Sequence, residues 1–210
     1  MSRNEKIKQI LETRDIRVLL HFTQLSNLPS ILQGGLKTRD NLDNSAKYND
    51  EMRLDNHTDT VSISIHHPND SMFFKYRQKD CNVDWCVLGI DPIILLKQDA
   101  LFCKHNAACA SISSLEEAEL RKSKALEEMF AEIPSIKSRQ EQLLKPNDST
   151  DVQAEILVKG NIESKDIFGV VFTSKSAEEA HRGILNGRHT LIHAEREIYL
   201  SRREIQRRFN

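Results

Sequence analysis

Cysteine, proline, glycine and long apolar runs are all scarce in this sequence, and each scarcity excludes a class of protein. The four cysteines, Cys81, Cys86, Cys103 and Cys109, follow no zinc-binding spacing, so we expect reduced thiols and no metal. No apolar run approaches the ~20 residues that span a bilayer. The polar first residues are not followed by the apolar segment of a signal peptide, so we expect none. We therefore expect a cytoplasmic protein with no membrane partner.

Glycine-rich phosphate-binding motifs are also missing. No Gly-x-Gly-x-x-Gly follows a strand pattern, and no Gly-x4-Gly-Lys-Ser/Thr occurs, so a doubly wound nucleotide-binding fold is not predicted. The net charge is −1, and composition alone does not indicate a nucleic-acid-binding protein. Residues 181–210 nevertheless contain seven Arg against three Glu, which forms a basic patch.

The order of apolar segments predicts an α+β fold. With 210 residues the chain can bury one core without disulfides, and we predict a single domain over residues 1–210. The predicted strands cover residues 17–23, 61–65, 85–90, 100–103, 152–158, 167–172 and 190–200. The predicted helices cover 4–13 with Asn4 as N-cap, 28–33, 72–77, a short segment after Pro92, 115–132 and 176–186.

Two long polar stretches interrupt these elements. Residues 37–60 lack periodicity, and a stretch of this length inside a compact domain is usually a functional loop. It contains Tyr48 and Arg53. Each is either a functional residue of this loop or simply a side chain exposed to solvent. Residues 133–151 form the second loop, directly before the predicted strand 152–158.

Gln153 and Glu155 are the strongest candidates for chemistry. On a strand, residues two apart point to the same face, so this pattern predicts an amide beside a carboxylate. A carboxylate inside an apolar strand is paired, protonated or used in a reaction. The alternative is that Glu155 faces solvent while Ala154 and Ile156 face the core, and the residues alone leave both open.

Three other polar residues lie on predicted strands. His21 is at the end of the first strand, where a hydrogen-bonded structural histidine is the alternative to a functional one. Ser62 and Ser64 share one face of the next strand, which is equally typical of the polar face of an edge strand. Each is weak alone, but a histidine strand, then a serine strand, then Gln-x-Glu is the order of an ADP-ribosyltransferase active site.

Two motifs resemble the DarT family. The run 21–36, which opens with His21-Phe22-Thr23, is similar to its opening motif, and the run 150–160 resembles its closing catalytic motif. DarT proteins are toxins that use NAD+ to ADP-ribosylate bases in single-stranded DNA, and their partner is DarG, a macrodomain antitoxin. The resemblance implies an ADP-ribosyltransferase-like fold, a mixed or antiparallel split β-sheet core with flanking helices.

The resemblance also implies roles for individual residues. Glu155 and Arg53 correspond to catalytic residues, with Glu155 holding the nicotinamide ribose and Arg53 binding pyrophosphate or assisting proton transfer. The residues that correspond to the NAD+ site are His21, Thr23, Asn27, Leu28, Tyr48 and Arg53.

On the acceptor side, the resemblance implies that loop 139–154 recognises the substrate. Gln153 corresponds to the position that reads the acceptor, and an amide there suits a nucleobase edge. Thr150, Lys75 and Arg77 are the other predicted contacts to single-stranded DNA. Residues 62–77 and 106–108 are more similar to the guanine-modifying branch than to the thymine-modifying one. The alternatives are an ADP-ribosyltransferase of this fold that acts on RNA or protein, and a non-catalytic nucleic-acid-binding domain.

Overall fold

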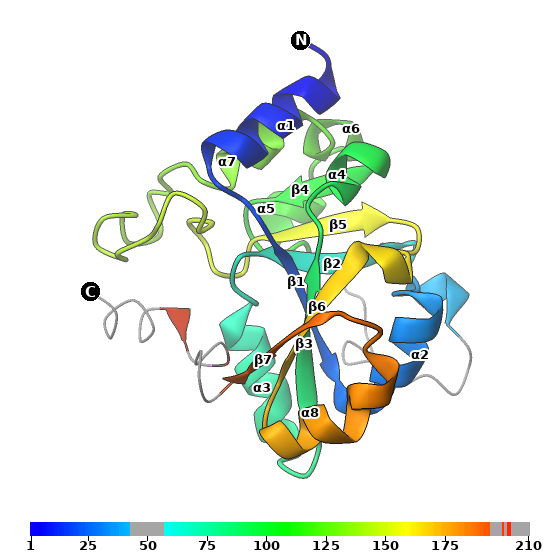
Figure 1. Cartoon of the computed structure of the whole chain (residues 1–210). Coiled ribbons are helices and arrows are strands. Elements are labelled where there is room, and N and C mark those ends of the chain that lie inside the picture. The colour runs from blue at the N-terminus through cyan, green and yellow to red at the C-terminus, as the bar shows by residue number, and fades with distance from the viewer. Residues whose placement is uncertain (43–56, 194–198, 200, 203–210) are drawn as a thin grey trace.

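The computed structural model describes residues 1–42, 57–193, 199, 201 and 202, and at its centre is a seven-stranded sheet (Figure 1). The strands are β1 (Leu19–Gln24), β2 (Thr60–Ile65), β3 (Trp85–Ile90), β4 (Ala100–Cys103), β5 (Glu155–Lys159), β6 (Ile167–Phe172) and β7 (His189–Ile192). Their order is β4-β5-β2-β1-β3-β6-β7, and only the β6–β7 pair in this set is parallel. The α+β prediction is confirmed.

The sheet is split between β2 and β1. These strands are joined by two residue pairs, Leu19 with Ile65 and Leu20 with Ser64. By contrast, β1 pairs with β3 along its whole length, from Leu19 to Gln24. The sheet therefore consists of two halves, β4-β5-β2 and β1-β3-β6-β7, which part beyond Leu20. The split core implied by the family resemblance is present.

Eight α-helices flank the sheet in the described part of the chain. They are α1 (Arg3–Thr13), α2 (Leu28–Gly34), α3 (Asp70–Lys79), α4 (Ile94–Lys97), α5 (Ala110–Ser113), α6 (Glu117–Leu120), α7 (Ser123–Glu128) and α8 (Lys175–His181). α1 begins at a capping box between Ser2 and Glu5, so the predicted cap at Asn4 is wrong. α2 ends at Gly35, where φ is +83° and a Cβ would lie 2.2 Å from the Ile162 carbonyl oxygen.

The helix predicted over residues 115–132 is instead two short helices, α6 and α7. Lys122 is extended between them, with φ of −69° and ψ of 145°. The break redirects the chain, because Leu120 packs beside Leu101 and Leu157 whereas Leu126 enters the large core on the other face of the sheet. The spacing of charged and apolar residues over 115–132 does not indicate that the chain passes from one face of the sheet to the other.

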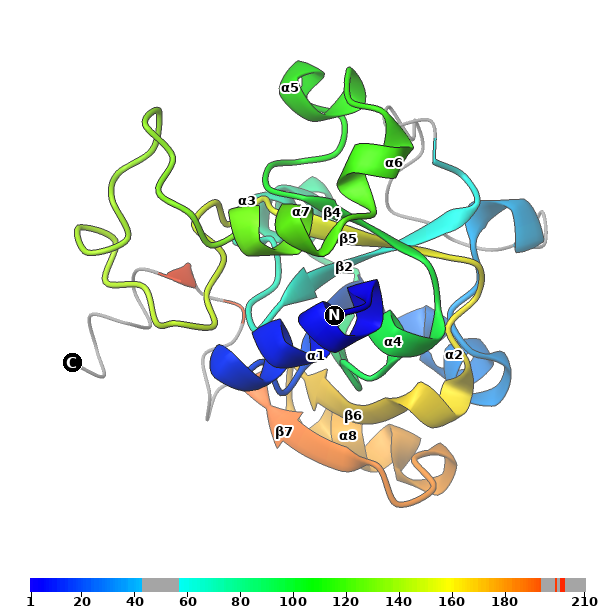
Figure 2. The same ribbon diagram turned by 90° about the horizontal axis from the view of Figure 1, so that it is seen from above.

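Apolar clusters cover both faces of the sheet. A large cluster on one face is covered by α1, α2, α4 and α7, and α5 and α6 lie on the other side of β4 and β5 (Figure 2). The opposite face has two separate clusters, an aromatic one under α3 and a smaller one under α5 and α6. β2 contributes to neither of these two. Its side chains on that face are Thr60, Ser62 and Ser64, so a polar strip follows the split between two apolar patches.

Within the described residues, no helix combines the length and apolar character needed to cross a bilayer. All four cysteines are free, as predicted. His, Cys, Asp and Glu side chains of the described residues form no group of three that could hold a metal ion.

Candidate active site

Glu155 is buried and held at both carboxylate oxygens. It is the first residue of β5, and its side chain is 9% exposed. Oε1 accepts a hydrogen bond from the backbone N–H of Ala107 at 2.6 Å, and Oε2 accepts one from the hydroxyl of Ser62. Because β5 lies between β4 and β2, both donors reach the carboxylate from neighbouring segments. The alternative of a solvent-facing glutamate is therefore wrong.

Ser62 connects the two halves of the split sheet. Its hydroxyl donates to Glu155, and its carbonyl oxygen lies 2.8 Å from Nδ1 of His21. Backbone pairing of β1 with β2 ends one residue before His21, so the imidazole replaces the next ladder hydrogen bond. Since a carbonyl only accepts, Nδ1 carries the hydrogen. β2 is a central strand, and the interpretation of Ser62 as an edge-strand residue is wrong.

The other predicted NAD+ contacts near β1 differ in exposure. Thr23 is 4% exposed, and its Oγ1 accepts a hydrogen bond from Nδ2 of Asn27 at 3.1 Å. Asn27 thus lies at the start of α2 beside the strand that carries His21. Leu28 is fully buried in the large core, which leaves its backbone rather than its side chain for a ligand. Tyr48 and Arg53 lie outside the described residues.

Gln153 lies in a turn, not on β5. The strand begins at Glu155, so the prediction that the two side chains share one strand face is wrong. The backbone N–H of Gln153 donates to Oδ1 of Asp151 at 2.9 Å, which stabilises a tight turn, and the Gln153 side chain is exposed. The two residues are therefore in different environments, one accessible to a large substrate and one enclosed.

A histidine that the sequence reasoning missed joins this turn to the loop after β4. Nδ1 of His105 lies 2.7 Å from Oδ2 of Asp151, and both side chains are mostly buried. Ala107, two residues further on, is the backbone donor to Glu155. The His105–Asp151 pair therefore connects the segment that holds the glutamate to the turn that presents Gln153. The two partners are 46 residues apart, and no local motif marks them.

Two of the predicted substrate contacts, Thr150 and Arg77, form hydrogen bonds with other residues of the protein. Thr150 is fully buried, and its hydroxyl accepts a hydrogen bond from Nη1 of Arg139 at 3.0 Å. Arg77 donates to the Tyr199 carbonyl at 3.0 Å, with its guanidinium carbon 5.0 Å from the Phe73 ring centre. Burial lowers the pKa of Arg77. Thr150 has no exposed surface that could contact DNA, whereas Arg77 is partly exposed and Lys75 on α3 is exposed.

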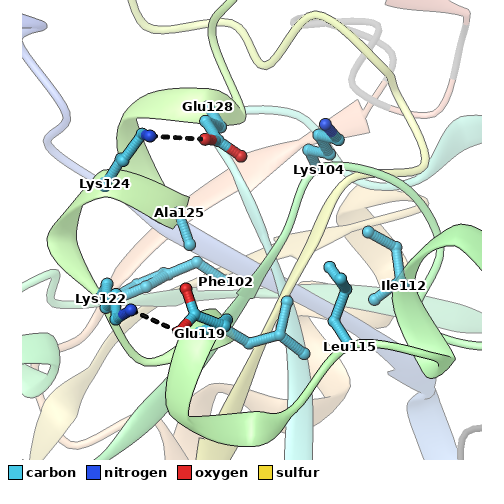
Figure 3. A pocket seen from close by; sticks show the side chains of 10 residues that line it. Phe102, Lys104, Ile112, Leu115, Glu119, Lys122, Lys124, Ala125 and Glu128 are labelled. Atoms are coloured by element: carbon cyan, nitrogen blue, oxygen red, sulfur yellow. Dashed lines mark hydrogen bonds and ion pairs between the residues drawn. The ribbon is translucent and has the colours of Figure 1, made fainter.

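A pocket of about 190 Å³ lies between β4 and helices α5 to α7. Figure 3 shows Phe102, Ala125, Ile112 and Leu115 around it, with the Lys124–Glu128 ion pair at its rim. Its lining contains none of the residues that bond to Glu155. This pocket is therefore distinct from the immediate surroundings of Glu155.

The split sheet, with a buried glutamate on a central strand, defines the ADP-ribosyltransferase-like class of fold. The family profile described as "ssDNA thymidine ADP-ribosyltransferase, DarT" matches residues 20–200. The chain belongs to the DarT family, as its two motifs predicted. No curated protein sequence matches it.

Solved DarT structures have the same fold. Thermus sp. 2.9 DarT in complex with ADP-ribosylated ssDNA gives a TM-score of 0.57 at 15% identity, covering 85% of this chain and 94% of that one. The same protein in complex with NAD+ gives 0.53 at 14% identity, covering 85% and 96%. Thermosipho africanus DarTG in complex with ADP-ribose gives 0.57 at 14% identity, with 84% of this chain aligned to half of that chain.

Proposed function

We propose that this chain transfers ADP-ribose from NAD+ to a base of single-stranded DNA. The observation that carries the proposal is the double hydrogen bonding of Glu155 at the split between β2 and β1. A buried carboxylate whose two oxygens are held in place is preorganised for a positive charge, and family membership supplies the reaction class.

The donor half of the reaction is a glycosyl transfer. The bond from C1′ of the ribose to the nicotinamide nitrogen breaks, and its electron pair leaves with nicotinamide. Positive charge develops on the ribose, and Glu155 stabilises it while holding a ribose hydroxyl. His21, fixed by the Ser62 carbonyl, and Thr23, fixed by Asn27, orient NAD+ beside this carboxylate. Arg53 and Tyr48 complete the NAD+ site in this proposal.

The acceptor half of the reaction forms the new bond between the base and C1′ of the ribose. A nitrogen of the base attacks C1′, and the proton that this nitrogen loses passes to solvent or through Arg53. Gln153 reads the acceptor, because its exposed amide offers a donor and an acceptor to a nucleobase edge. The base that we predict is still guanine, because residues 62–77 and 106–108 resemble the guanine-modifying branch of the family. The family description, by contrast, names thymidine.

The test is mass spectrometry of oligonucleotides incubated with the protein and NAD+. Four single-stranded oligonucleotides, each of which presents a different base as the candidate acceptor, identify the base that is modified. The expected product is heavier by one ADP-ribose and absent with Glu155→Gln. A matched RNA strand and a duplex serve as controls. No product on any DNA strand, or product on RNA alone, contradicts the proposal.

We further propose that the chain acts as a toxin reversed by a macrodomain partner of the DarG type. The support is the similarity to T. africanus DarTG, which contains further sequence beyond the aligned half. Expression should arrest growth, and co-expression with an ADP-ribose-removing macrodomain should restore it. Arrest by Glu155→Gln at equal expression would assign the toxicity to something other than transfer.

A further inference from the structure

Three consecutive backbone carbonyls before the Gln153 turn accept hydrogen bonds from arginine side chains. Nη1 of Arg139 donates to the Asp148 carbonyl at 2.7 Å. Nη1 of Arg202 donates to the Ser149 carbonyl at 2.7 Å, and its Nη2 to the Thr150 carbonyl at 3.4 Å. A guanidinium has five donors in a rigid plane, so a single arginine can fix adjacent carbonyls in a way that lysine cannot.

Arg202 comes from a distant part of the chain and is enclosed. Its residue is 6% exposed, and burial lowers the pKa of its guanidinium, partly offset by Asp148 and Asp70. Its own backbone N–H donates to Oδ2 of Asp70 at 2.8 Å, which fastens it to the start of α3. In both overall views the short red segment near the C-terminal end lies beside the yellow-green loop that precedes β5 (Figures 1 and 2).

A continuous set of contacts leads from Arg202 to Gln153. Arg202 fixes the Ser149 carbonyl, and the Ser149 hydroxyl donates to the Asp151 carbonyl at 2.8 Å. Oδ1 of Asp151 in turn accepts the backbone N–H of Gln153 at 2.9 Å. Glu155 is held by different donors, Ser62 and Ala107. The contacts of Arg202 thus support the acceptor turn directly, and the His105–Asp151 pair joins that turn to the segment that holds the catalytic carboxylate.

We propose that Arg202 is a positioning residue for the acceptor side of the reaction. It fixes the backbone under the turn, and so the direction in which Gln153 faces the base, without contacting either substrate. The inference rests on the proposed transferase function. It assigns a member of the basic patch at residues 181–210 to the support of the site instead of to DNA.

The experiment separates the two halves of the reaction in Arg202→Ala and Arg202→Lys. Release of nicotinamide from NAD+ without DNA measures the donor half, and labelled ADP-ribose on single-stranded DNA measures transfer. We expect transfer to fall about tenfold to a hundredfold, because a small misplacement of a reacting group has effects of this size. Hydrolysis and the KM for NAD+ should stay within about threefold.

Arg188 supplies a matched control. Its guanidinium also donates to backbone carbonyls, those of Ile167 at 2.8 Å and Ser164 at 2.9 Å, far from the Gln153 turn. Arg188→Ala should leave the ratio of transfer to hydrolysis unchanged. Equal losses of transfer and hydrolysis in the Arg202 variants, or unchanged transfer, would overturn the proposal. Arg202→Lys answers the same question if the alanine variant fails to fold.

Hydrogen exchange gives a readout that needs no DNA product. The amides of residues 149–154 should exchange faster in Arg202→Lys than in wild type, whereas those of β5 should not. If wild type modifies no DNA, the proposed function fails, but exchange still tests the positioning. Unchanged exchange at 149–154 would overturn the positioning role whatever the reaction.

Discussion

The hydroxyl of Ser62 donates a hydrogen bond to Oε2 of Glu155 across 93 residues of sequence. The same residue meets His21 through its carbonyl, so one serine connects the two sides of the split sheet. The carboxylate is therefore set by its neighbours on β2 and in the loop after β4, not by its own strand.

Glu155→Gln should abolish transfer while the fold is kept. The amide has nearly the same shape and can still accept from Ala107 and contact Ser62, but it has no negative charge to stabilise the ribose cation. We expect a loss of at least about a hundredfold in kcat on DNA. Glu163→Gln, at an exposed glutamate paired with Lys165, is the matched control and should leave both kcat and Tm near wild type.

Ser62→Ala should reduce transfer while leaving His21 in place. The variant removes the hydroxyl donor but keeps the carbonyl that Nδ1 of His21 contacts. Loss of a hydrogen bond to a buried charged group costs about 1.5–3 kcal/mol, or roughly tenfold to a hundredfold in kcat/KM. Ser64→Ala on the same strand face provides the comparison. Equal effects of the two substitutions would remove the special role of Ser62.

Gln153→Ala should weaken DNA modification more than NAD+ binding. Gln153 lies in the exposed turn, whereas the groups assigned to NAD+ lie on β1 and α2. Calorimetric titration with NAD+ and transfer kinetics measure the two effects separately. Gln9→Ala, at an exposed glutamine of α1, should change neither. Loss of NAD+ binding in Gln153→Ala would contradict this division.

The His105–Asp151 pair should act as a unit. At 2.7 Å the two side chains form a charge-assisted hydrogen bond between the Ala107 segment and the Gln153 turn. A double-mutant cycle with His105→Gln and Asp151→Asn should give a coupling energy of about 0.5–3 kcal/mol for transfer. Additive effects of the two substitutions would show that the pair is not a functional connection.

Stability should fall at acidic pH through His66. Burial lowers the pKa of His66, which has a φ of +57° and whose Nε2 accepts the backbone N–H of Arg17 at 3.2 Å. Below the unfolded-state pKa of about 6.5 the unfolded chain binds a proton that the folded chain does not, so this contribution is complete above that pH and is lost as pH falls.

The measurement is the urea midpoint of unfolding at several pH values between 5 and 8. His66→Gln should flatten the lower part of this profile relative to wild type. His189→Gln, at an exposed histidine of β7, should keep the wild-type slope. A profile of His66→Gln parallel to wild type would assign the pH dependence to other groups.

The fold was predictable where local pattern and burial agree. The strands over residues 61–65, 85–90, 100–103 and 167–172 appear within one residue of their expected bounds, because their neighbours in the sheet enclose them as strongly as their apolar runs suggested. The start of α2 at Asn27 and its end at Gly35 follow from Pro29 and a required positive φ. The predicted strand at 152–158 begins late, since Asp151 binds the chain into a turn first.

The site was predictable in identity but not in environment. Glu155 was found through a motif, yet whether it faces solvent depends on the loop after β4, whose Ala107 N–H cannot be placed from sequence. The edge-strand alternative for Ser62 stayed open because strand order is not encoded locally. His105 and Arg202 were missed as supports because their partners lie 46 and 53 residues away and have no signature of their own.

The long-range character of the Glu155 contacts also has a consequence for folding. Ser62 and Ala107 reach the carboxylate only after segments 93 and 48 residues apart have met. Such closures are late events, because distant pairings must overcome the entropy of long loops. A partly folded chain would thus have an ordinary hydrated glutamate with no oriented donors. During synthesis, the growing chain therefore has no oriented donors around Glu155 until β2, β4 and β5 have come together.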